Sequence, residues 1–385
     1  MGTVLIHTDC RRYRGAEPCR PHKERGARCT TCGHYDQVEH RILIVKLGAM
    51  GDVLRTTSCL GPLRRRYPRG HVTWITRANA VPLLERNPLV DRLLVVDANY
   101  LEFLLAEEFD VAIGPDTDAL SASIMRVARA REKYGFVADG RAGVMASNQA
   151  ARAWWHLGLD DQLKRQNRVT YGQWLYAMCD LPMPVERPVL EPSSGARDRV
   201  AALLHDRAPE RRRWVCFNTG ASGRWTEKRW KPAHYRDLAA LLTRDDADTG
   251  ILLIGGPEEG AFNASLLASG GQFVDAGTTN SVDEFAAVVA ASEWILTPDS
   301  LGYHVACAVE TPATCLVGPT SPWELDVYGA NQVLYSDREC IACYLPACPL
   351  STTCMDALTA SAVWDRVRTW SAGSGSTCAV SAVTA

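Results

Sequence analysis

The stretch RILIVKLGAMGDVLRTTSCL, from Arg41 to Leu60, decides the fold. It opens with an apolar run at residues 42–45, which is typical of a strand buried on both faces of a parallel sheet. Gly48 and Gly51 then allow a tight turn, and a helix is predicted to begin there. Asp52 stands at that turn. We expect it either to cap the helix as its N-cap residue or to face a ligand at the carboxyl end of the strand, and the stretch alone leaves both roles open.

Length and composition set limits on the class of protein. The chain has 385 residues, of which 46% are hydrophobic and 22% charged, enough for two domains that each have a core. A formal net charge of -2 gives no general attraction to nucleic acid or to an anionic membrane. There is no apolar run of about 18 residues, as a spanning helix needs, and the first residues do not resemble a signal peptide. We therefore predict a cytoplasmic protein with no membrane span and no nucleic-acid partner.

Short apolar runs alternate with helix-like stretches along most of the chain. The runs lie at 42–47, 72–76, 92–96, 111–114 and 134–137 in the first half, and at 214–218, 251–254, 273–275, 294–297 and 314–317 in the second. Such alternation indicates βαβ units around parallel sheets. The predicted fold class is therefore α/β, with two Rossmann-like domains that are joined by a Pro-rich linker and face each other, although the periodicity alone equally describes other two-domain α/β proteins.

The same patterns predict four parts of the chain. Residues 1–40 are rich in Cys, Arg and His without helix or strand periodicity, and form a Cys-rich N-terminal appendage. The two Rossmann-like domains take residues 41–190 and 191–370. Small residues dominate 371–385, which is expected to be a flexible tail.

Four predicted strands of the second half end in polar and small residues. The segments are NTGASGRWTEKRWKP (218–232), GGPEEG (255–260), TPDSLGYH (297–304) and GPTSP (318–322). Small residues expose backbone N–H groups, and nearby cations neutralise an anionic ligand. Each segment alone is equally explained by a solvated loop or a helix cap. Their convergence at one edge of a sheet favours a ligand site.

Together with KLGAMGDVLRTT (46–57), these segments resemble glycosyltransferase family 9, the heptosyltransferases, over about Arg41–Tyr328. The resemblance implies a GT-B fold and inverting transfer of a sugar, typically heptose from ADP-heptose, with no metal needed for the chemistry. The first domain would then take the acceptor and the second the nucleotide-sugar donor. The acceptor could be a glycan, a protein or a small natural product, and the formation of a homo-oligomer is left open.

The resemblance also implies roles for individual residues. Asp52 matches the general base, and Lys228 matches the lysine that binds the donor phosphates. The other donor-binding residues implied are Thr219 and Ser222 for the diphosphate, Glu258 or Glu259 for the ribose, and Asp299, Ser300, Gly302 and His304 near the nucleotide and sugar. Leu301 stands where the family more often has the first glycine, and Gly48 and Ala49 replace hydroxyl residues of some members. Acceptor recognition is therefore expected to differ.

Two cysteine groups have spacings that suit a bound metal. The first is Cys10, Cys19, Cys29 and Cys32, and the second is Cys340, Cys343, Cys348 and Cys354. Four thiolates can close a tetrahedral zinc or iron site, and the second group is similar to the iron finger of protein-modifying members of the family. We predict a structural metal at one or both groups, with reduced structural thiols as the alternative. The cysteines at 59, 179, 216, 307 and 315 are expected in the cores.

Two other functions fit the same patterns. A nucleotide-sugar epimerase also uses two facing α/β domains, and would convert its substrate without an acceptor. A non-catalytic interaction module stabilised by metal would use the cysteine groups to bind a partner, and would have no affinity for nucleotide sugars.

Overall fold

The computed structural model describes residues 5–96, 100–141, 143–221, 226–270, 273–371 and 379–383. The chain forms two compact units. The first contains residues 1–48, 59–153 and 175–184, and the second contains residues 49–58, 154–174 and 185–385. The segments 49–58 and 154–174 thus group with the second unit, whereas the sequence analysis assigned them to the domain 41–190.

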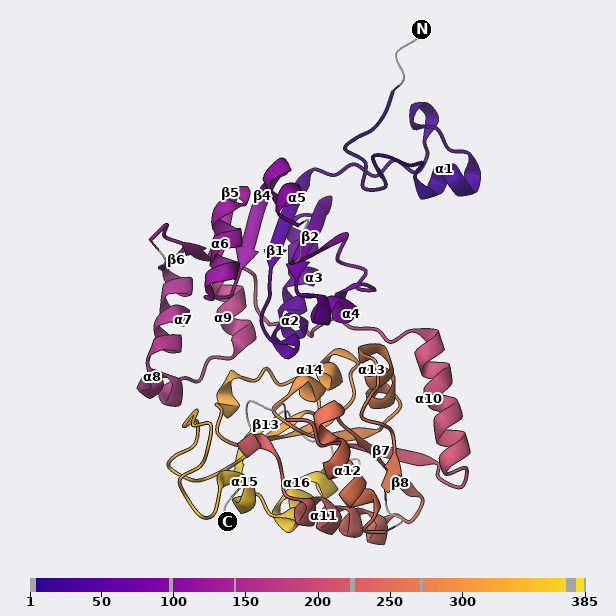
Figure 1. The fold of residues 1–385 in the computed structure, drawn as a ribbon, viewed down its shortest axis with the longest axis vertical. Coiled ribbons are helices and arrows are strands. Elements are labelled where there is room, and N and C mark those ends of the chain that lie inside the picture. The colour runs from indigo at the N-terminus through magenta and orange to yellow at the C-terminus, as the bar shows by residue number, and fades with distance from the viewer. Residues whose placement is uncertain are drawn as a thin grey trace. The chain divides into compact units, whose positions relative to one another are not determined.

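The first unit is built on a six-stranded sheet of order β3-β2-β1-β4-β5-β6 (Figure 1). Its strands are β1 (His40–Val45), β2 (Gly70–Thr76), β3 (Arg92–Val95), β4 (Glu108–Gly114), β5 (Arg129–Ala138) and β6 (Val144–Ala146). The first five are parallel and β6 is antiparallel to β5. The residues Ile42 to Val45 are fully buried, which confirms the interpretation of this run as a strand covered on both faces.

Short helices connect these strands. They are α3 (Leu60–Arg66), α4 (Val81–Leu84), α5 (Tyr100–Ala106) and α6 (Ala119–Val127), with the 3-10 turns η2 (Thr57–Cys59) and η3 (Ala78–Ala80). Side chains from α5 and α6, including Leu104 and Ile124, pack with Leu43 and Ile75 of the central strands in one apolar core. Burial of these side chains supplies most of the driving force for folding of the sheet.

The amino-terminal segment belongs to the first unit. Within residues 5–39 the structure has one short helix, α1 (Arg20–Arg25), and one 3-10 turn, η1 (Cys29–Thr31). Arg11 joins the segment to the sheet, because its guanidinium pairs with Asp36 at 3.1 Å and with Asp91 at 2.6 Å. Arg64 binds the other oxygen of Asp91. Whether residues 1–40 form a separate appendage stays a prediction.

The second unit is built on a seven-stranded parallel sheet of order β13-β12-β11-β10-β7-β8-β9. Its strands are β7 (Arg213–Asn218), β8 (Thr249–Ile254), β9 (Phe273–Asp275), β10 (Trp294–Pro298), β11 (Ala313–Val317), β12 (Gln332–Ser336) and β13 (Ala379–Val383). The five expected strands are present, and β12 and β13 were not predicted. The prediction of a flexible tail is wrong for Ala379–Val383, which pair with β12; residues 372–378 lie outside the described part of the chain.

Helices flank this second sheet. They are α10 (Ser194–Arg207), α11 (Pro232–Asp245), α12 (Gly260–Leu267), α13 (Val282–Ala290), α14 (Leu301–Ala308), α15 (Cys354–Ala357) and α16 (Ala360–Ser371), with η4 (Thr226–Lys228), η5 (Pro257–Glu259) and η6 (Pro322–Glu324). Figure 1 shows α11, α12 and α16 on one side of the sheet and α13 and α14 on the other. The aromatic side chains of Phe217, Trp230, Tyr235 and Trp294 lie in the main core.

The remaining helices are α2 (Met50–Thr56), α7 (Gln149–Leu159), α8 (Asp161–Gln166) and α9 (Tyr171–Met178). Helix α2 packs against α14 within the second unit. In the part of the chain that the structure describes, no helix is both long and apolar enough to cross a bilayer.

We predict that Gly135→Ala destabilises the first unit. Gly135 has φ of +110°, and a Cβ there would lie 2.0 Å from the carbonyl oxygen of Gly114 on the adjacent strand. Backbone strain and overpacking together should lower the free energy of unfolding by about 2 kcal/mol or more, measured by urea denaturation. Gly158→Ala is the control, because a Cβ at Gly158 meets nothing within 4 Å. Equal stability of the two variants would contradict the prediction.

Candidate functional site

The site is built at the carboxyl edge of the second sheet. Strands β10 and β7 are neighbours at its centre. From β7 the chain continues to β8 on one side, and from β10 it continues to β11 on the other. This reversal of strand order is where open parallel sheets bind ligands. The loops after these four strands carry the polar segments found in the sequence, so the predicted convergence of these segments at one edge is confirmed.

Lys228 and Asp299 form a buried ion pair at this edge. The Lys228 Nζ lies 2.6 Å from the Asp299 Oδ2 and also donates to the Asp299 carbonyl oxygen at 3.2 Å. The Thr320 hydroxyl donates to the same carboxylate at 2.7 Å. Burial opposes the charged form of Asp299, but Lys228 and the hydrogen bond from Thr320 prevail and lower its pKa to about 2. The carboxylate is therefore ionised, and the ammonium stays held in one place.

Asn218 connects the loop after β7 to the loop after β10. Its side-chain amide donates to the Thr297 hydroxyl at 2.9 Å and to the Ser300 hydroxyl at 3.2 Å, while its Oδ1 accepts from the backbone N–H of Gly220. Gly302 leaves the space for this contact, because a Cβ there would lie 2.4 Å from the Asn218 Nδ2. Ser300 and Gly302 thus shape the loop, and Ser300 is also the N-cap residue of α14.

His304 lies in the second turn of α14 and is 8% exposed. Burial and the nearby Arg55 guanidinium lower the pKa of His304 to about 4, although Asp299 and Asp52 act in the opposite direction. Its ring faces α2, since a Cβ on Gly51 would lie 2.8 Å from the His304 Cδ2. The imidazole is therefore neutral at physiological pH and stands between Asp299 and Asp52.

Asp52 is not the N-cap residue that the sequence suggested. The N-cap of α2 is Ala49, and Asp52 is the third residue of the helix. The helix begins at Met50, so two helical residues precede Asp52 and its side chain lies in the first turn of the helix. A carboxylate at that position still interacts favourably with the helix dipole. Its Oδ1 pairs with Arg55 at 2.8 Å, and 35% of the side chain is exposed.

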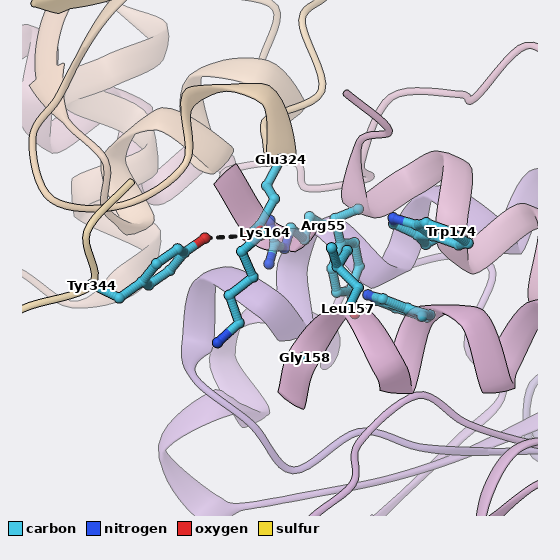
Figure 2. A pocket seen from close by; sticks show the side chains of 9 residues that line it. Arg55, Leu157, Gly158, Lys164, Trp174, Glu324 and Tyr344 are labelled. Atoms are coloured by element: carbon cyan, nitrogen blue, oxygen red, sulfur yellow. Dashed lines mark hydrogen bonds between the residues drawn. The ribbon is translucent and has the colours of Figure 1, made fainter. Parts of the chain in front are cut away.

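Arg55 connects Asp52 to a group of residues that the sequence analysis did not include. The guanidinium lies 3.7 Å from the centre of the Tyr171 ring, and Glu324 and Asp326 also stabilise its positive charge. Arg55 and Tyr171 line a cavity of about 250 Å³ together with residues of α7 and α9 and with Glu324 and Tyr344 (Figure 2). The carboxylate of Asp52 is thereby joined to a cavity by a single side chain.

Thr219 and Glu259 have partners within the protein, in place of the ligand contacts that were predicted for them. Thr219 is fully buried, and its hydroxyl bonds to Asn263 at 2.6 Å, so this residue holds the loop rather than facing a diphosphate. Glu259 is also buried, pairs with Arg229 at 2.7 Å and accepts from the Gly256 N–H. Of the two candidates for the ribose, only Glu258 is exposed. Ser222 lies outside the described residues.

The second cysteine group gathers around Cys354. Burial, with the nearby Cys343, Cys340 and Cys348 thiols acting in the same direction, raises the pKa of the Cys354 thiol to about 11. Within the described ranges, however, no three His, Cys, Asp or Glu side chains are arranged to hold a metal ion. The cysteines expected in the cores, at 59, 179, 216, 307 and 315, are buried as predicted.

Residues 100–353 match the family described as Glycosyltransferase family 9 (heptosyltransferase). Lipopolysaccharide heptosyltransferase 1 of Salmonella typhimurium is 24% identical over 321 residues, which cover 76% of this chain and 93% of that protein. The crystal structure of a family 9 glycosyl transferase from Veillonella parvula has a TM-score of 0.71 at 17% identity, covering 86% and 97% of the two chains. E. coli ADP-heptose lps heptosyltransferase II has a TM-score of 0.63 at 20% identity, covering 85% and 97%.

The fold and the match define the class, which is a glycosyltransferase with two Rossmann-like sheets in the GT-B fold. The family model covers most of the chain, and the chain belongs to glycosyltransferase family 9. The family and the fold that the sequence resemblance implied are therefore confirmed.

Sequence reasoning missed four residues of this site, which are Arg55, Thr320, Tyr171 and Glu324. Arg55 stands three residues after Asp52 on a helix, a spacing at which opposite charges pair, so this partner could have been found. Thr320 lies in a segment that was recognised, but nothing local showed which carboxylate it would bind. Tyr171 and Glu324 are far from Asp52 in sequence, and only the tertiary fold brings them to Arg55.

We predict that His304 makes the protein less stable in mild acid. The unfolded state binds a proton near the ordinary pKa of 6.5, and the folded state only near 4. Stability is then fully present above pH 6.5 and falls as the pH drops toward 4, by about 2 kcal/mol between pH 7 and 4.5. Urea denaturation at both pH values should show His304→Gln losing correspondingly less stability than the wild type. Identical losses would show that His304 is not the group responsible.

Proposed function

We propose that this protein is an inverting glycosyltransferase that transfers heptose from ADP-heptose to an acceptor hydroxyl. One observation supports it above the others: the charges of Asp52, Asp299 and Lys228 all act on the same buried His304, so a partly exposed carboxylate and a buried cation share one site in the second unit. The transfer requires a base beside the acceptor hydroxyl and a cation beside the diphosphate leaving group. The similarity to heptosyltransferases, one of them named for ADP-heptose, supports the choice of donor.

Asp52 acts as the general base in this proposal. Its carboxylate takes the proton of the acceptor hydroxyl while that oxygen attacks the anomeric carbon of the heptose. The bond from the anomeric carbon to the diphosphate breaks on the opposite face, which inverts the configuration. Arg55 holds Oδ1 of the carboxylate, and the partial exposure of Asp52 gives an acceptor access. Positioning of this kind is worth a large part of the rate enhancement.

Lys228 acts on the leaving group. The electron pair of the breaking bond stays on the diphosphate, and the ammonium stabilises the charge that develops there. Asp299 holds the Lys228 ammonium, and Thr320 in turn holds the Asp299 carboxylate. Both groups are in position before the reaction, so little reorganisation is needed. With a lysine in this role, the transfer needs no metal ion for the chemistry. His304 is neutral, so its ring can donate one hydrogen bond to the nucleotide sugar or accept one from it.

Asp52→Asn should lower kcat by about 10²–10⁴-fold, because the general base is lost. Affinity for ADP, measured by calorimetry, should change little. Asp365→Asn is the matched control: Asp365 pairs with Arg368 at 3.1 Å with the same i,i+3 spacing on α16 as Asp52 with Arg55 on α2. Full transferase activity in Asp52→Asn, followed by mass spectrometry of products from ADP-heptose, would rule out the assigned base.

The same assay separates the two alternatives. An epimerase would form a new nucleotide sugar from ADP-heptose without any acceptor. A non-catalytic module would show no binding of ADP at all. Neither has a supporting observation in the structure beyond those already used for the transferase.

We further propose a structural zinc or iron at the second cysteine group. The spacing of Cys340, Cys343, Cys348 and Cys354 in sequence and their electrostatic effect on the Cys354 thiol support it, since four thiolates suit either metal. The first group, with Cys10, Cys19, Cys29 and Cys32, remains a weaker candidate for the same role. A closed four-thiolate site has no open position for substrate, so any such metal would stabilise the fold.

Elemental analysis of the purified protein should find zinc or iron, and Cys343→Ser should reduce it by about one ion per chain. Cys59→Ala is the control, because Cys59 is a fully buried core thiol. Removal of the metal by a chelator should lower the melting temperature, since binding and folding are coupled. Protein free of both metals would contradict the proposal.

The setting of the reaction is also proposed. A soluble nucleotide-sugar donor is consistent with a cytoplasmic enzyme. A homo-oligomer is compatible with this function.

A further inference from the structure

The cavity beside Arg55 has walls of aromatic rings. Trp154 comes from α7, Tyr171 and Trp174 come from α9, and Tyr344 lies in the loop after β12. Figure 2 shows Trp174 and Tyr344 on opposite sides, with Arg55 between them. The volume of about 250 Å³ is just below the roughly 300–1,000 Å³ that holds a drug-sized ligand. It therefore suits a single ring rather than a folded peptide.

Two buried donors in the walls are unsatisfied. The Nε of Arg55 and the Nε1 of Trp174 have no hydrogen-bond partner among the described residues. Buried donors are normally paired, so a ligand with acceptor oxygens would complete them. Glu324 is an acceptor in the same wall. Its carboxylate accepts from the Tyr344 hydroxyl at 2.9 Å and can also accept a hydrogen bond from a ligand. A hydroxylated ring offers both kinds of atom.

The charges around the cavity disfavour an anion. Asp52, Glu324 and Asp326 all act on the single Arg55 guanidinium. Lys164 is already paired with Asp161 at 3.0 Å and lies 5.1 Å from the centre of the Tyr344 ring. Both cations of the cavity are therefore neutralised by the protein itself. A negatively charged ring would face the half-buried carboxylate of Glu324 in the wall without a spare cation.

We propose that this cavity is the acceptor subsite and that it takes an uncharged hydroxylated ring, with one hydroxyl directed to Asp52. The aromatic walls stack on the C–H faces of the ring, and Arg55 both lines the cavity and positions the base. This assignment rests on the proposed transferase function, because it needs Asp52 to act on an acceptor. It selects a sugar or cyclitol unit over a protein side chain or an anionic sugar.

Gly158 provides the sharpest test. It lines the cavity on α7, and a Cβ there meets nothing within 4 Å, so the backbone accepts a side chain at this position and Gly158→Leu narrows the cavity. Gly158→Ala is the matched control, since both changes remove a helical glycine and only leucine reaches far into the cavity. The probes are methyl glycosides of uncharged hexoses and myo-inositol, with the corresponding methyl hexuronides as anionic counterparts.

Binding is followed by tryptophan fluorescence, because Trp154 and Trp174 line the cavity. We expect at least one uncharged ring to shift the emission of the full-length protein, Gly158→Leu to weaken that binding at least tenfold, and Gly158→Ala to retain it. Trp174→Phe, which removes the N–H donor together with part of the aromatic wall, should weaken it by about fivefold or more, because one hydrogen bond and some stacking area are lost. Tighter binding of the hexuronides, equal binding to Gly158→Leu, or no response to any ring would overturn the assignment.

Calorimetry with ADP distinguishes this failure from failure of the proposed function. Gly158→Leu should bind ADP as the wild type does, because the donor residues around Lys228 lie elsewhere in the unit. If the wild type binds no ADP while the ring probes behave as expected, the transferase mechanism and the acceptor role both fail, and only the binding of an uncharged ring in the cavity stands. If ADP binds and the ring probes fail, the reverse holds.

Discussion

The ion pair between Asp52 and Arg55 is the interaction on which the site depends. It holds one oxygen of the carboxylate in the first turn of α2. The same guanidinium packs on the Tyr171 ring and balances the half-buried carboxylates of Glu324 and Asp326. Removing it would leave all three carboxylates without their shared cation, which is costly for charges that are partly withdrawn from water. Base, cavity and loop after β11 are therefore held together by one side chain.

The second ion pair prepares the other end of the reaction. Lys228 and Asp299 are fixed by Thr320, and Asn218 fixes the neighbouring loops through Thr297 and Ser300. Preorganised charges of this kind act without reorganisation when the leaving group departs. The charges of both ion pairs act on the neutral His304, whose pKa is lowered chiefly by its burial. The arrangement places a base and a cation in one electrostatic network.

Most of the fold could be predicted from the sequence, because buried parallel strands are short apolar runs between helices. Ile42 to Val45 and the five runs of the second half are examples. Strands β12 and β13 were missed: Gln332–Ser336 is short and follows a loop, and β13 is only five residues of small side chains near a Ser- and Gly-rich segment. Strand β13 forms because its backbone pairs with β12, and its local sequence does not predict that pairing.

The sequence by itself determined the family, the order of the strands along the chain and the identity of the charged residues at the strand ends, because these follow from local patterns and motifs. Only the tertiary structure decided what those residues do. It moved Asp52 from the cap to the first turn, turned Thr219 and Glu259 inward to partners of their own, and brought Tyr171 and Glu324 to Arg55. Hydrogen bonds and ion pairs between residues far apart in sequence depend on packing, which no local pattern contains.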